Sequence, residues 1–466
     1  MSIALTTSRA RPATGLILFT MSLGVLIAQI DTSVVNLAVK PIGADLKASV
    51  TALQWIVDAY NLVYASLLLS AGTLADLYGR RLIFALGIVL FTLGTLVCGL
   101  APDVVTLVVG RAVAGLGAAL EVPASLAILT IAYPDPRERT RALGVWASCY
   151  GIAMVIGPTA GGMLVDSSGW RSIFLLIVPF CAVTLFLVLT SVPESSSPQG
   201  RRLDLPGQAL AIAALGSFSL AAIEGPRWGW TSTASVAAFS FSVVATALFF
   251  GRQAGATGAL VPLPILRHRV FTACLAVAAA MTFGAYAMLF LTPLYFQTVR
   301  GASALHAAVA LLPMSLSFIV TSQLSGPIAN KVGPRVPMTA GMALMGFGLL
   351  MLALISLNDS LTLIETALLA IGCGLGLNAG PMNAVAVANV PAARSGTASG
   401  LVNTARMIGA TLGVAVLGAV FAMHVTQDAG TQGLAPAYLG GGIGELIGAA
   451  VAFAFIRHDS LRTPTG

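Results

Sequence analysis

The stretch TGLILFTMSLGVLIAQIDTSVVNLAVKP, from Thr14 to Pro41, decides how the rest of the chain is interpreted. It carries no charge until Asp31, and a further apolar run then extends to Ala38. At about 1.5 Å per helical residue, a helix of this length crosses the ~30 Å hydrocarbon core of a bilayer with some tilt. Asp31 therefore lies inside the membrane, where a carboxylate is costly and should face a bundle interior or a wet cavity. We interpret it as a proton or substrate-cation site, with a helix cap or an interfacial acid as the alternative.

The composition excludes a soluble protein. The chain has 466 residues, of which 57% are hydrophobic and only 9% are charged, whereas soluble domains carry about 25% charged residues. The net charge of +7 comes without a basic cluster with interleaved aromatic residues, so we expect no nucleic-acid partner. All five cysteines lie in apolar runs without close pairing, which indicates packing residues and neither disulfides nor a metal site. We predict an all-α polytopic membrane protein.

Apolar runs long enough to cross a bilayer recur along the chain. We place fourteen spans near residues 14–38, 52–75, 82–101, 104–132, 142–165, 172–192, 205–224, 232–251, 271–296, 306–329, 337–356, 361–388, 400–424 and 438–456. Of the 24 lysines and arginines, 17 fall on the side of the N-terminus and five on the other, while Arg111 and Arg406 lie within spans. Because positive residues gather on the cytoplasmic side, we expect both termini to be cytoplasmic.

A short turn recurs in the second half of the chain. GTLADLYGRR (Gly72–Arg81) is matched by GPIANKVGPR (Gly326–Arg335) in both glycines, the alanine and the last arginine. Two related six-span halves leave two spans over. We therefore predict a first six-span bundle in residues 1–200, a two-span insert with its linkers in 201–259, and a second six-span bundle in 260–466.

Four charged residues of the first half are expected inside the membrane. Counting along the antiparallel spans places Asp31, Asp58 and Arg111 at one level in the outer half, with Glu121 deeper on the same span as Arg111. A buried arginine stays charged and needs a counter-charge or a wet cavity. We predict that Asp31 or Asp58 pairs with Arg111 and that these four residues couple proton movement. A static structural ion pair is the alternative, and Glu121 is either a second proton site or a protonated packing residue.

The repeated turn suggests a conformational switch formed by Gly72, Asp76, Gly79, Arg80 and Arg81. Asp76 can accept hydrogen bonds from backbone N–H groups at a neighbouring helix N-terminus, or pair with Arg80 or Arg81. Contacts that form in only one conformation bias a two-state rocking motion. The alternative is that the arginines only fix topology, which leaves the repeated Gly–Asp/Asn–Gly spacing unexplained.

The fifth span contains a second glycine motif, with Gly157, Pro158, Gly161 and Gly162. The proline frees backbone groups, and the glycines permit close helix contact. A kinked, tightly packed helix between the two halves fits a seal against leak, and a plain kink is the alternative.

These motifs resemble those of the major facilitator superfamily. The turn Gly72–Arg81 is similar to its signature loop, and Gly110–Pro123 is similar to its fourth-span motif, where the arginine is implicated in proton transfer. Gly151–Gly162 resembles the motif typical of its antiporters. Three further stretches look like the fourteen-span drug:proton antiporter family, namely Gln29–Ala38, Leu53–Tyr60 and Arg394–Arg406. Ala221–Trp230 resembles exporters of the methylenomycin-resistance type.

The resemblance implies two six-helix bundles plus two inserted helices, a location in the bacterial inner membrane, and a substrate that is a small hydrophobic or cationic drug. Three departures are Glu121, Met407 where a glutamine often follows the arginine, and the lack of an acid in the middle of span ten. The last departure argues against divalent cationic substrates.

The chain offers no source of energy other than an ion gradient. Its three lysines do not end a G-x-x-x-x-G-K phosphate loop, and no catalytic triad or zinc-type cluster is present in the sequence, so we expect no ATP, no cofactor and no enzyme activity. A substrate cavity is expected near the midplane between the halves. Its candidate lining residues in the second half are Tyr286, Phe290, Tyr295, Gln297, Asn378 and Asn383.

We therefore predict an exporter of hydrophobic or amphipathic drugs or antibiotics that is coupled to protons, uses alternating access and functions as a monomer. One alternative is a proton-coupled or facilitated transporter of an ordinary metabolite. Another is a receptor or scaffold without transport.

Overall fold

The computed structural model describes residues 14–198, 203–255, 259–356, 360–391, 394–424 and 433–460. These residues form helices joined by turns, and none of them lies in a β-strand. Fourteen helices in this described part are long and apolar enough to cross a membrane, which confirms the predicted fold class. The elements are α1 (Thr14–Asp45), α2 (Val50–Tyr78), α3 (Arg80–Gly99), α4 (Val104–Ala132), α5 (Pro136–Ser168), α6 (Arg171–Ser191), α7 (Leu205–Trp228), α8 (Thr233–Gly255), α9 (Leu263–Leu266), α10 (Arg269–Thr298), α11 (Ala304–Ala310), α12 (Leu312–Val332), α13 (Arg335–Ala353), a 3₁₀ turn (Leu354–Ser356), α14 (Leu361–Ala388), α15 (Ser395–His424) and α16 (Leu434–Phe455).

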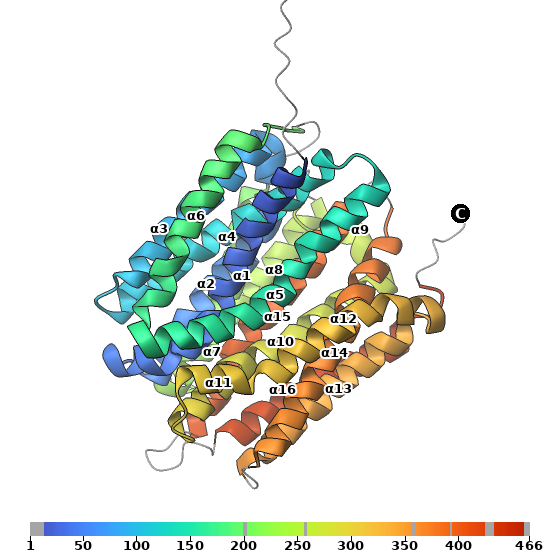
Figure 1. Ribbon diagram of the computed structural model, residues 1–466. Helices are drawn as coiled ribbons and strands as arrows, with labels where there is room; N and C mark the ends of the chain where they lie inside the picture. Colours follow the sequence, from blue (N-terminus) through green and yellow to red (C-terminus); the bar gives the residue numbers. More distant parts are fainter. Residues whose placement is uncertain are drawn as a thin grey trace, which may run out of the picture.

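The helices form two bundles that lie side by side. Helices α1 to α6, blue to green in Figure 1, occupy one side, and α10 to α16, yellow to red, occupy the other. We call the end of the molecule that holds the turn between α1 and α2 the α1–α2 end, and the opposite one the α2–α3 end. The basic residues Arg9, Arg11, Arg201, Arg202 and Arg462, used above for orientation, lie outside the described residues.

Two helix boundaries differ from the expectation. Helix α1 continues through Pro41 to Asp45. A proline leaves the carbonyl four residues earlier, here that of Leu37, without its helical partner. Gln297 of α10 donates a hydrogen bond to this carbonyl instead, so the helix continues. The tenth span is interrupted at Leu311, between α11 and α12. Pro313 stands at the start of α12, where a proline fits the first turn of a new helix.

Within each bundle, small residues let helix backbones approach closely. A methyl group added to Gly94 of α3 would collide with the backbone of Ala114 in α4, and one added to Gly348 of α13 would meet the backbone of Ala367 in α14. Such contacts replace the hydrophobic driving force that is missing between helices in lipid.

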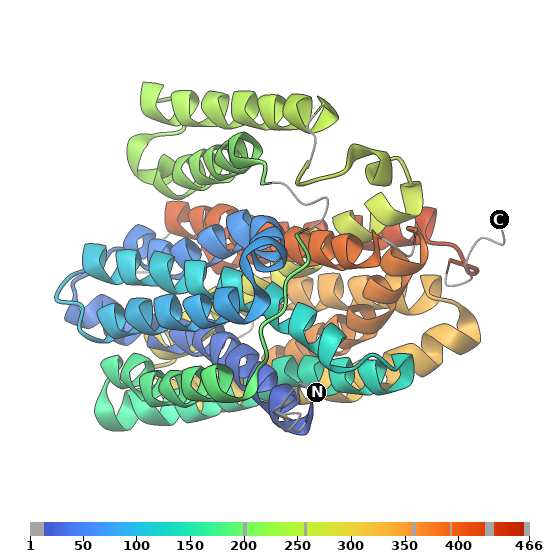
Figure 2. The same cartoon turned by 90° about the horizontal axis from the view of Figure 1, so that it is seen from above.

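The two inserted helices pack outside the bundles, at the seam between them. Helix α7 contacts α2 of the first bundle and α15 of the second, and α8 packs on the outer side of α7. Figure 2 shows both helices, in green and yellow-green, standing beyond the two bundles, with α8 outermost. Gln208 fixes α7 to α2 by donating to the carbonyl of Ser66 at 2.7 Å and by pairing with the hydroxyl of Ser70. The division into residues 1–200, 201–259 and 260–466 as separate units stays a prediction.

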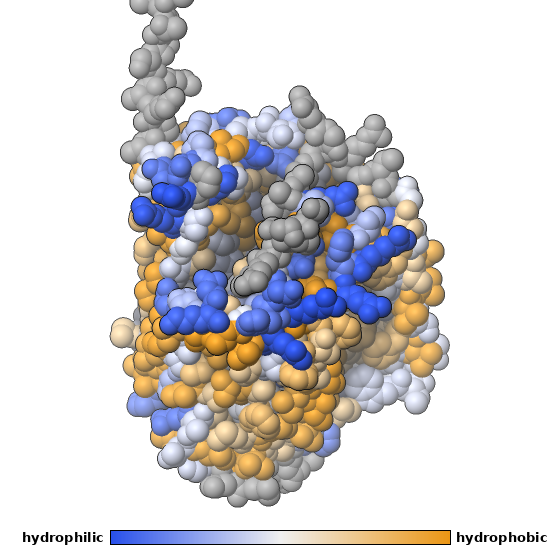
Figure 3. Space-filling view, turned by 90° about the vertical axis from the view of Figure 1, so that its right-hand side faces the viewer, coloured by the Kyte–Doolittle hydropathy of each residue, from blue (hydrophilic) through white to orange (hydrophobic). Residues whose placement is uncertain are grey.

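The surface is apolar where a bilayer would surround it. Figure 3 shows hydrophilic residues gathered across part of one face, with hydrophobic residues covering the surface below. Large apolar side chains on the outer helices are exposed, among them Phe186 of α6 and Val243 of α8. The protein is therefore a multi-pass membrane protein.

Candidate functional site

A buried ion pair joins α1 to α4. The guanidinium of Arg111 lies 2.5 Å from a carboxylate oxygen of Asp31, and the two side chains are 2% and 0% exposed. Nε of Arg111 donates to the carbonyl of Ile56 at 3.2 Å, and its guanidinium lies 4.5 Å from the ring centre of Tyr60. Of the two partners predicted for Arg111, the structure selects Asp31.

Asp58 does not join this pair, although it was placed at the same level. Its carboxylate is fully buried and faces Ser219 of α7. Within the described part of the chain, neither its two oxygens nor the Ser219 hydroxyl have a hydrogen-bond partner. Depth along α2 was therefore not sufficient, because Asp58 points to the inserted helices and Arg111 lies on the other side of α2.

Two glutamates are buried within the bundles. Glu121 of α4 is 1% exposed and lies against Gly87 of α3. Glu445 of α16 is 0% exposed and lies against Gly284 of α10. The carboxylate oxygens of both have no hydrogen-bond partner among the described residues. The two interpretations of Glu121 stay open.

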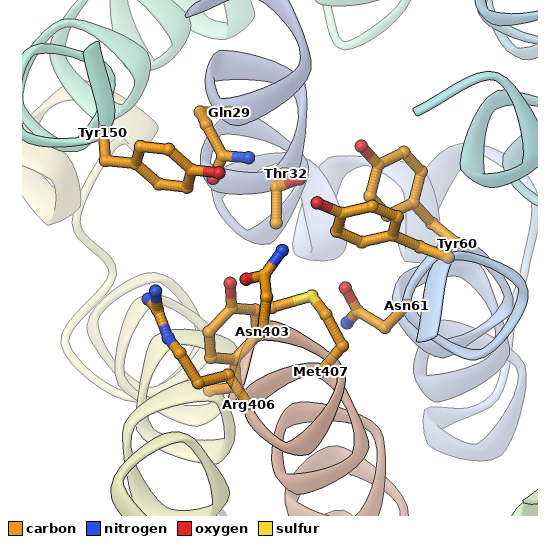
Figure 4. A pocket seen from close by; sticks show the side chains of 10 residues that line it. Gln29, Thr32, Tyr60, Asn61, Tyr150, Asn403, Arg406 and Met407 are labelled. Atoms are coloured by element: carbon orange, nitrogen blue, oxygen red, sulfur yellow. The ribbon is translucent and has the colours of Figure 1, made fainter. Parts of the chain in front are cut away.

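A small cavity lies between the two bundles, near the middle of the helices (Figure 4). It is narrow in this conformation, so a drug-sized molecule requires the bundles to separate. Tyrosines, amides and one arginine line it, and they come from α1, α2, α5, α10 and α15: Gln29, Thr32, Tyr60, Asn61, Tyr64, Tyr150, Tyr286, Asn403, Arg406 and Met407.

Tyr60 separates this cavity from the ion pair. Its ring lines the cavity and also lies against the guanidinium of Arg111. Gln29 and Thr32, which flank Asp31 on α1, line the cavity as well. A ligand in the cavity and the carboxylate of Asp31 are thus one side chain apart.

The glycine motif of α5 packs on both bundles. Gly157 lies against Ser33 and Gly161 against Val34, both on α1, while Gly162 lies against the backbone of Ala304 and Leu305 on α11. The contact with α11 supports the predicted place of this motif between the halves.

Pro158 lines a second small cavity, nearer the α1–α2 end. A proline leaves the carbonyl four residues earlier without its helical partner. That carbonyl belongs to Met154, and the hydroxyl of Ser315 on α12 donates to it at 2.8 Å. The freed backbone group thus becomes a link between the bundles.

Further links hold the α1–α2 end closed. Both oxygens of Asp166, at the end of α5, accept from the first N–H groups of α11, at Ala304 and Leu305, each at 2.9 Å. The side chain of Gln297 donates to the carbonyl of Leu37 at 2.9 Å, and Nζ of Lys40 donates to the carbonyl of Gln297.

At the α2–α3 end, the predicted switch residues form local contacts. Arg80 pairs with Asp76 at 2.7 Å across the turn, which is one of the contacts predicted for this carboxylate. Gly79 has a φ of 115°, a conformation that glycine adopts without strain. Arg81 donates to the carbonyl of Val192 at 3.2 Å. Gly72 lies against Pro123 of α4.

Sequence reasoning missed Glu194, which follows α6. Its carboxylate accepts from the backbone N–H groups of Arg81 and Leu82 at 3.0 Å each and so caps α3. The equivalent turn of the second bundle, at Gly333, lies against His458, which follows α16. Glu194 and His458 each follow the last helix of their half and each contact the repeated turn of that half. This correspondence between the halves could have indicated Glu194.

Of the six residues expected in a substrate cavity, Tyr286 lines the central one. The other five lie outside the two cavities described here, and their contacts do not support the prediction. Phe290 is fully buried in a hydrophobic cluster that contains residues of both bundles, Tyr295 accepts from Arg300, and Gln297 bridges to α1. The amides of Asn378 and Asn383 bond to carbonyls of their own helix, at Gly374 and Ala379.

Several cavity residues were not predicted, among them Asn403, Arg406 and Met407. They lie on one face of α15, at the spacing of one helical turn. Polar residues at this spacing inside an apolar span were the available signal.

Comparisons with known proteins agree with this architecture. Residues 21–414 match the model of the family described as Major Facilitator Superfamily. The chain is 40% identical, over 87% of its length and 76% of the relative's, to the multidrug resistance protein Stp of Mycobacterium tuberculosis. It is 34% identical, over 95% of its length and 92% of the relative's, to the methylenomycin A resistance protein of Streptomyces coelicolor.

A solved structure shares the fold. A bacterial homologue of the human lysosomal transporter Spinster, in an inward-facing and unoccupied conformation, superimposes with a TM-score of 0.69 at 20% identity. The match covers 97% of this chain and 98% of that one.

Proposed function

Because this chain belongs to the Major Facilitator Superfamily, we propose that it exports drug-like molecules in exchange for protons. Its relatives are named as resistance proteins for drugs and for methylenomycin A, which favours export of compounds of this kind. In this proposal the protein works as a monomer in the bacterial inner membrane, with both termini in the cytoplasm and without ATP.

The buried Asp31–Arg111 pair next to the central cavity carries the proposal. When a proton binds to Asp31, the carboxylate becomes neutral and Arg111 is left with an uncompensated charge in a medium of low dielectric constant. The proton therefore changes the free energy of the region that Tyr60 shares with the cavity. A substrate that binds there competes energetically with the protonated state, which is the requirement for antiport.

Alternating access requires that the two ends open in turn. In the proposed orientation the α1–α2 end faces outward, and the hydrogen bonds of Asp166 and Gln297 across the bundles keep it closed. For release, these bonds break while contacts at the α2–α3 end form, as in a rocking motion of two bundles about a central site.

Transport of an ordinary metabolite by symport or uniport is the second candidate function. The uncharged amides and tyrosines of the cavity would suit a polar metabolite. The glycine motif on α5, which resembles the motif typical of antiporters, favours antiport instead. Direction of proton movement separates the two.

The first test is the Asp31→Asn variant in a host that lacks its own drug pumps. A resistance profile across chemically varied compounds identifies the compound against which the wild-type protein protects most. We expect Asp31→Asn to lose this protection completely at equal membrane abundance, because asparagine keeps the shape and cannot carry the proton. Asp45→Asn is the matched control, since Asp45 pairs with Arg171 at the exposed surface. Protection that persists in Asp31→Asn would contradict coupling through this residue.

The second measurement uses the same compound and purified protein in acid-loaded vesicles. Antiport predicts that adding the compound outside makes the interior more alkaline, and that Asp31→Asn abolishes the change. Acidification of the interior would indicate symport. Movement of the compound without any change in pH would indicate uniport.

A further inference from the structure

We propose that Arg406 binds an anionic group of the substrate in the central cavity, so that the exported compounds are planar aromatic molecules bearing a carboxylate, phenolate or enolate. This inference rests on the proposed function as an exporter and names its substrate class. It replaces the hydrophobic or cationic class expected from the sequence.

The two arginines inside the spans, Arg111 and Arg406, differ in the partners of their guanidinium groups. Arg111 has a carboxylate at 2.5 Å, a carbonyl and a tyrosine ring. Arg406 forms no ion pair within the described part of the chain, and its buried Nε has no hydrogen-bond partner there. A guanidinium is always charged, and a charge without a partner inside a membrane protein is costly, so it marks a functional site.

The position of Arg406 is fixed by its backbone. Its carbonyl accepts a hydrogen bond from the hydroxyl of Thr282 on α10 at 2.5 Å, and Gly409 lies directly against the backbone of Ala279. Helix α15 is therefore held close to α10, and the Arg406 side chain extends along the cavity wall, as Figure 4 shows.

Among the described residues, no carboxylate lines the cavity to pair with a cation. Arg406 is the one charged residue among the ten that line it. None of the nearby acids lines the cavity, since Asp31 pairs with Arg111 behind Tyr60, Asp58 faces α7 and Glu121 lies against Gly87 of α3. A cationic substrate would meet an arginine and no carboxylate, whereas an anion gains a charge-assisted and often bidentate hydrogen bond.

The rest of the lining suits a flat aromatic body with oxygen substituents. Four tyrosine rings line the cavity and offer stacking surfaces and hydroxyl groups. The amides of Gln29, Asn61 and Asn403 add donors and acceptors, and Met407 supplies an adaptable apolar contact.

This substrate class changes the energetics of exchange. Export of one anion for entry of one proton moves positive charge into the cell, whereas exchange of a monovalent cation for one proton is electrically neutral. Transport of anions is therefore expected to increase with a membrane potential that is negative inside.

The test uses two planar aromatic probes of opposite charge, fluorescein and ethidium. Inside-out vesicles from a host without its own pumps are given an acid interior. We expect wild-type vesicles to accumulate fluorescein several-fold above vesicles without the protein, and to accumulate ethidium no more than those vesicles do. Arg406→Gln should lose fluorescein accumulation, and Arg406→Lys, which keeps the charge but not the fork of donors, should retain part of it. Arg171→Gln, at the exposed surface, is the matched control.

Ethidium accumulation without fluorescein accumulation would overturn the inference, and so would full fluorescein transport by Arg406→Gln. If neither probe moves, the inference also fails. The proposed exporter function fails only if the compound chosen from the resistance profile does not move either.

A binding measurement keeps the inference testable if Arg406→Gln does not reach the membrane. Fluorescence anisotropy of fluorescein with purified protein in detergent should show binding to the wild type that weakens with salt and weakens several-fold in Arg406→Lys. Absence of binding to the wild type would overturn the inference.

Discussion

A charged side chain inside the membrane needs a partner, which is either another group of the protein or a bound ligand. Arg111 belongs to the first kind, because Asp31 and Tyr60 surround its guanidinium. Arg406 belongs to the second, because the described residues offer it no carboxylate. A proton at Asp31 and an anion at Arg406 would therefore act on two sides of one tyrosine.

Asp76 is the residue at which the speed of the conformational change can be tested. It joins the last turn of α2 to Arg80 at the start of α3, and the equivalent residue of the second half is Asn330. We expect Asp76→Asn to slow turnover several-fold while leaving substrate affinity unchanged, because the change removes a charge far from the cavity. Initial transport rates and equilibrium binding of the same compound separate the two effects. Glu138→Gln, in the exposed first turn of α5, serves as the control.

Asp76→Asn that weakens binding at an unchanged turnover rate would contradict the role of this turn as a switch. Glu194 lies in the same region, because its carboxylate accepts from the backbone N–H of Arg81 and so caps the start of α3. A change at Asp76 therefore acts on a helix end that stays held by a second acid.

At the scale of helices, depth and length were predictable and orientation about the helix axis was not. Counting residues placed Asp31, Asp58 and Arg111 at one level, and the structure pairs Asp31 with Arg111. The same counting could not show that Asp58 faces Ser219, because the position of α7 depends on packing between segments far apart in the sequence. The fourteen spans followed from hydropathy, which the bilayer imposes along each segment by itself.

Prolines inside α1 and α5 explain where the bundles meet. Each proline frees a carbonyl, at Leu37 and Met154, and a side chain of the other bundle, Gln297 or Ser315, donates to it. The sequence shows the prolines but not the donors, which lie more than a hundred residues away. The bond of Gln297 to the carbonyl of Leu37 could therefore not be predicted from the sequence.

Gln297→Leu should make the α1–α2 end open more often. The carbonyl of Leu37 would be left buried without a partner in the closed state, at a cost of about 1–3 kcal/mol. We expect a cysteine placed at Asn36, which lines the second cavity, to react about tenfold faster with a membrane-impermeant maleimide, in line with that cost. The background is a variant without the five native cysteines.

Thr298→Val is the matched control for this change, because the Thr298 hydroxyl bonds within its own helix, to Leu294. Equal labelling rates in Gln297→Leu and the wild type would mean that this bond does not hold the closed state.

For the whole molecule, the two bundles are related by the repeated turn, but the insert joins them on one side only. Helix α7 touches α2 and α15, and its contacts run along α2 from Gln208, through Ser219 beside Asp58, to Glu224, which accepts from Trp55 at 3.0 Å. The insert thus covers the seam along which the bundles would separate.

Gln208→Leu tests whether α7 contributes to the stability of the whole. The change leaves the carbonyl of Ser66 and the hydroxyl of Ser70 without their partner, so the temperature at which purified protein aggregates in detergent should fall by a few degrees. Val243→Ala on the exposed face of α8 should leave it unchanged. An unchanged temperature in Gln208→Leu would mean that lipid and linkers alone hold the insert in place.

Helix α8 has a consequence of a different kind. Only 17% of the 18 residues that would cross the membrane in α8 are buried in the protein, so few of its side chains have a fixed neighbour there. Natural selection can act on the outward positions of α8 only through their solubility in lipid, and almost any aliphatic or aromatic residue satisfies that demand. Among related genes, this segment should diverge faster than any other span while its average hydropathy remains constant.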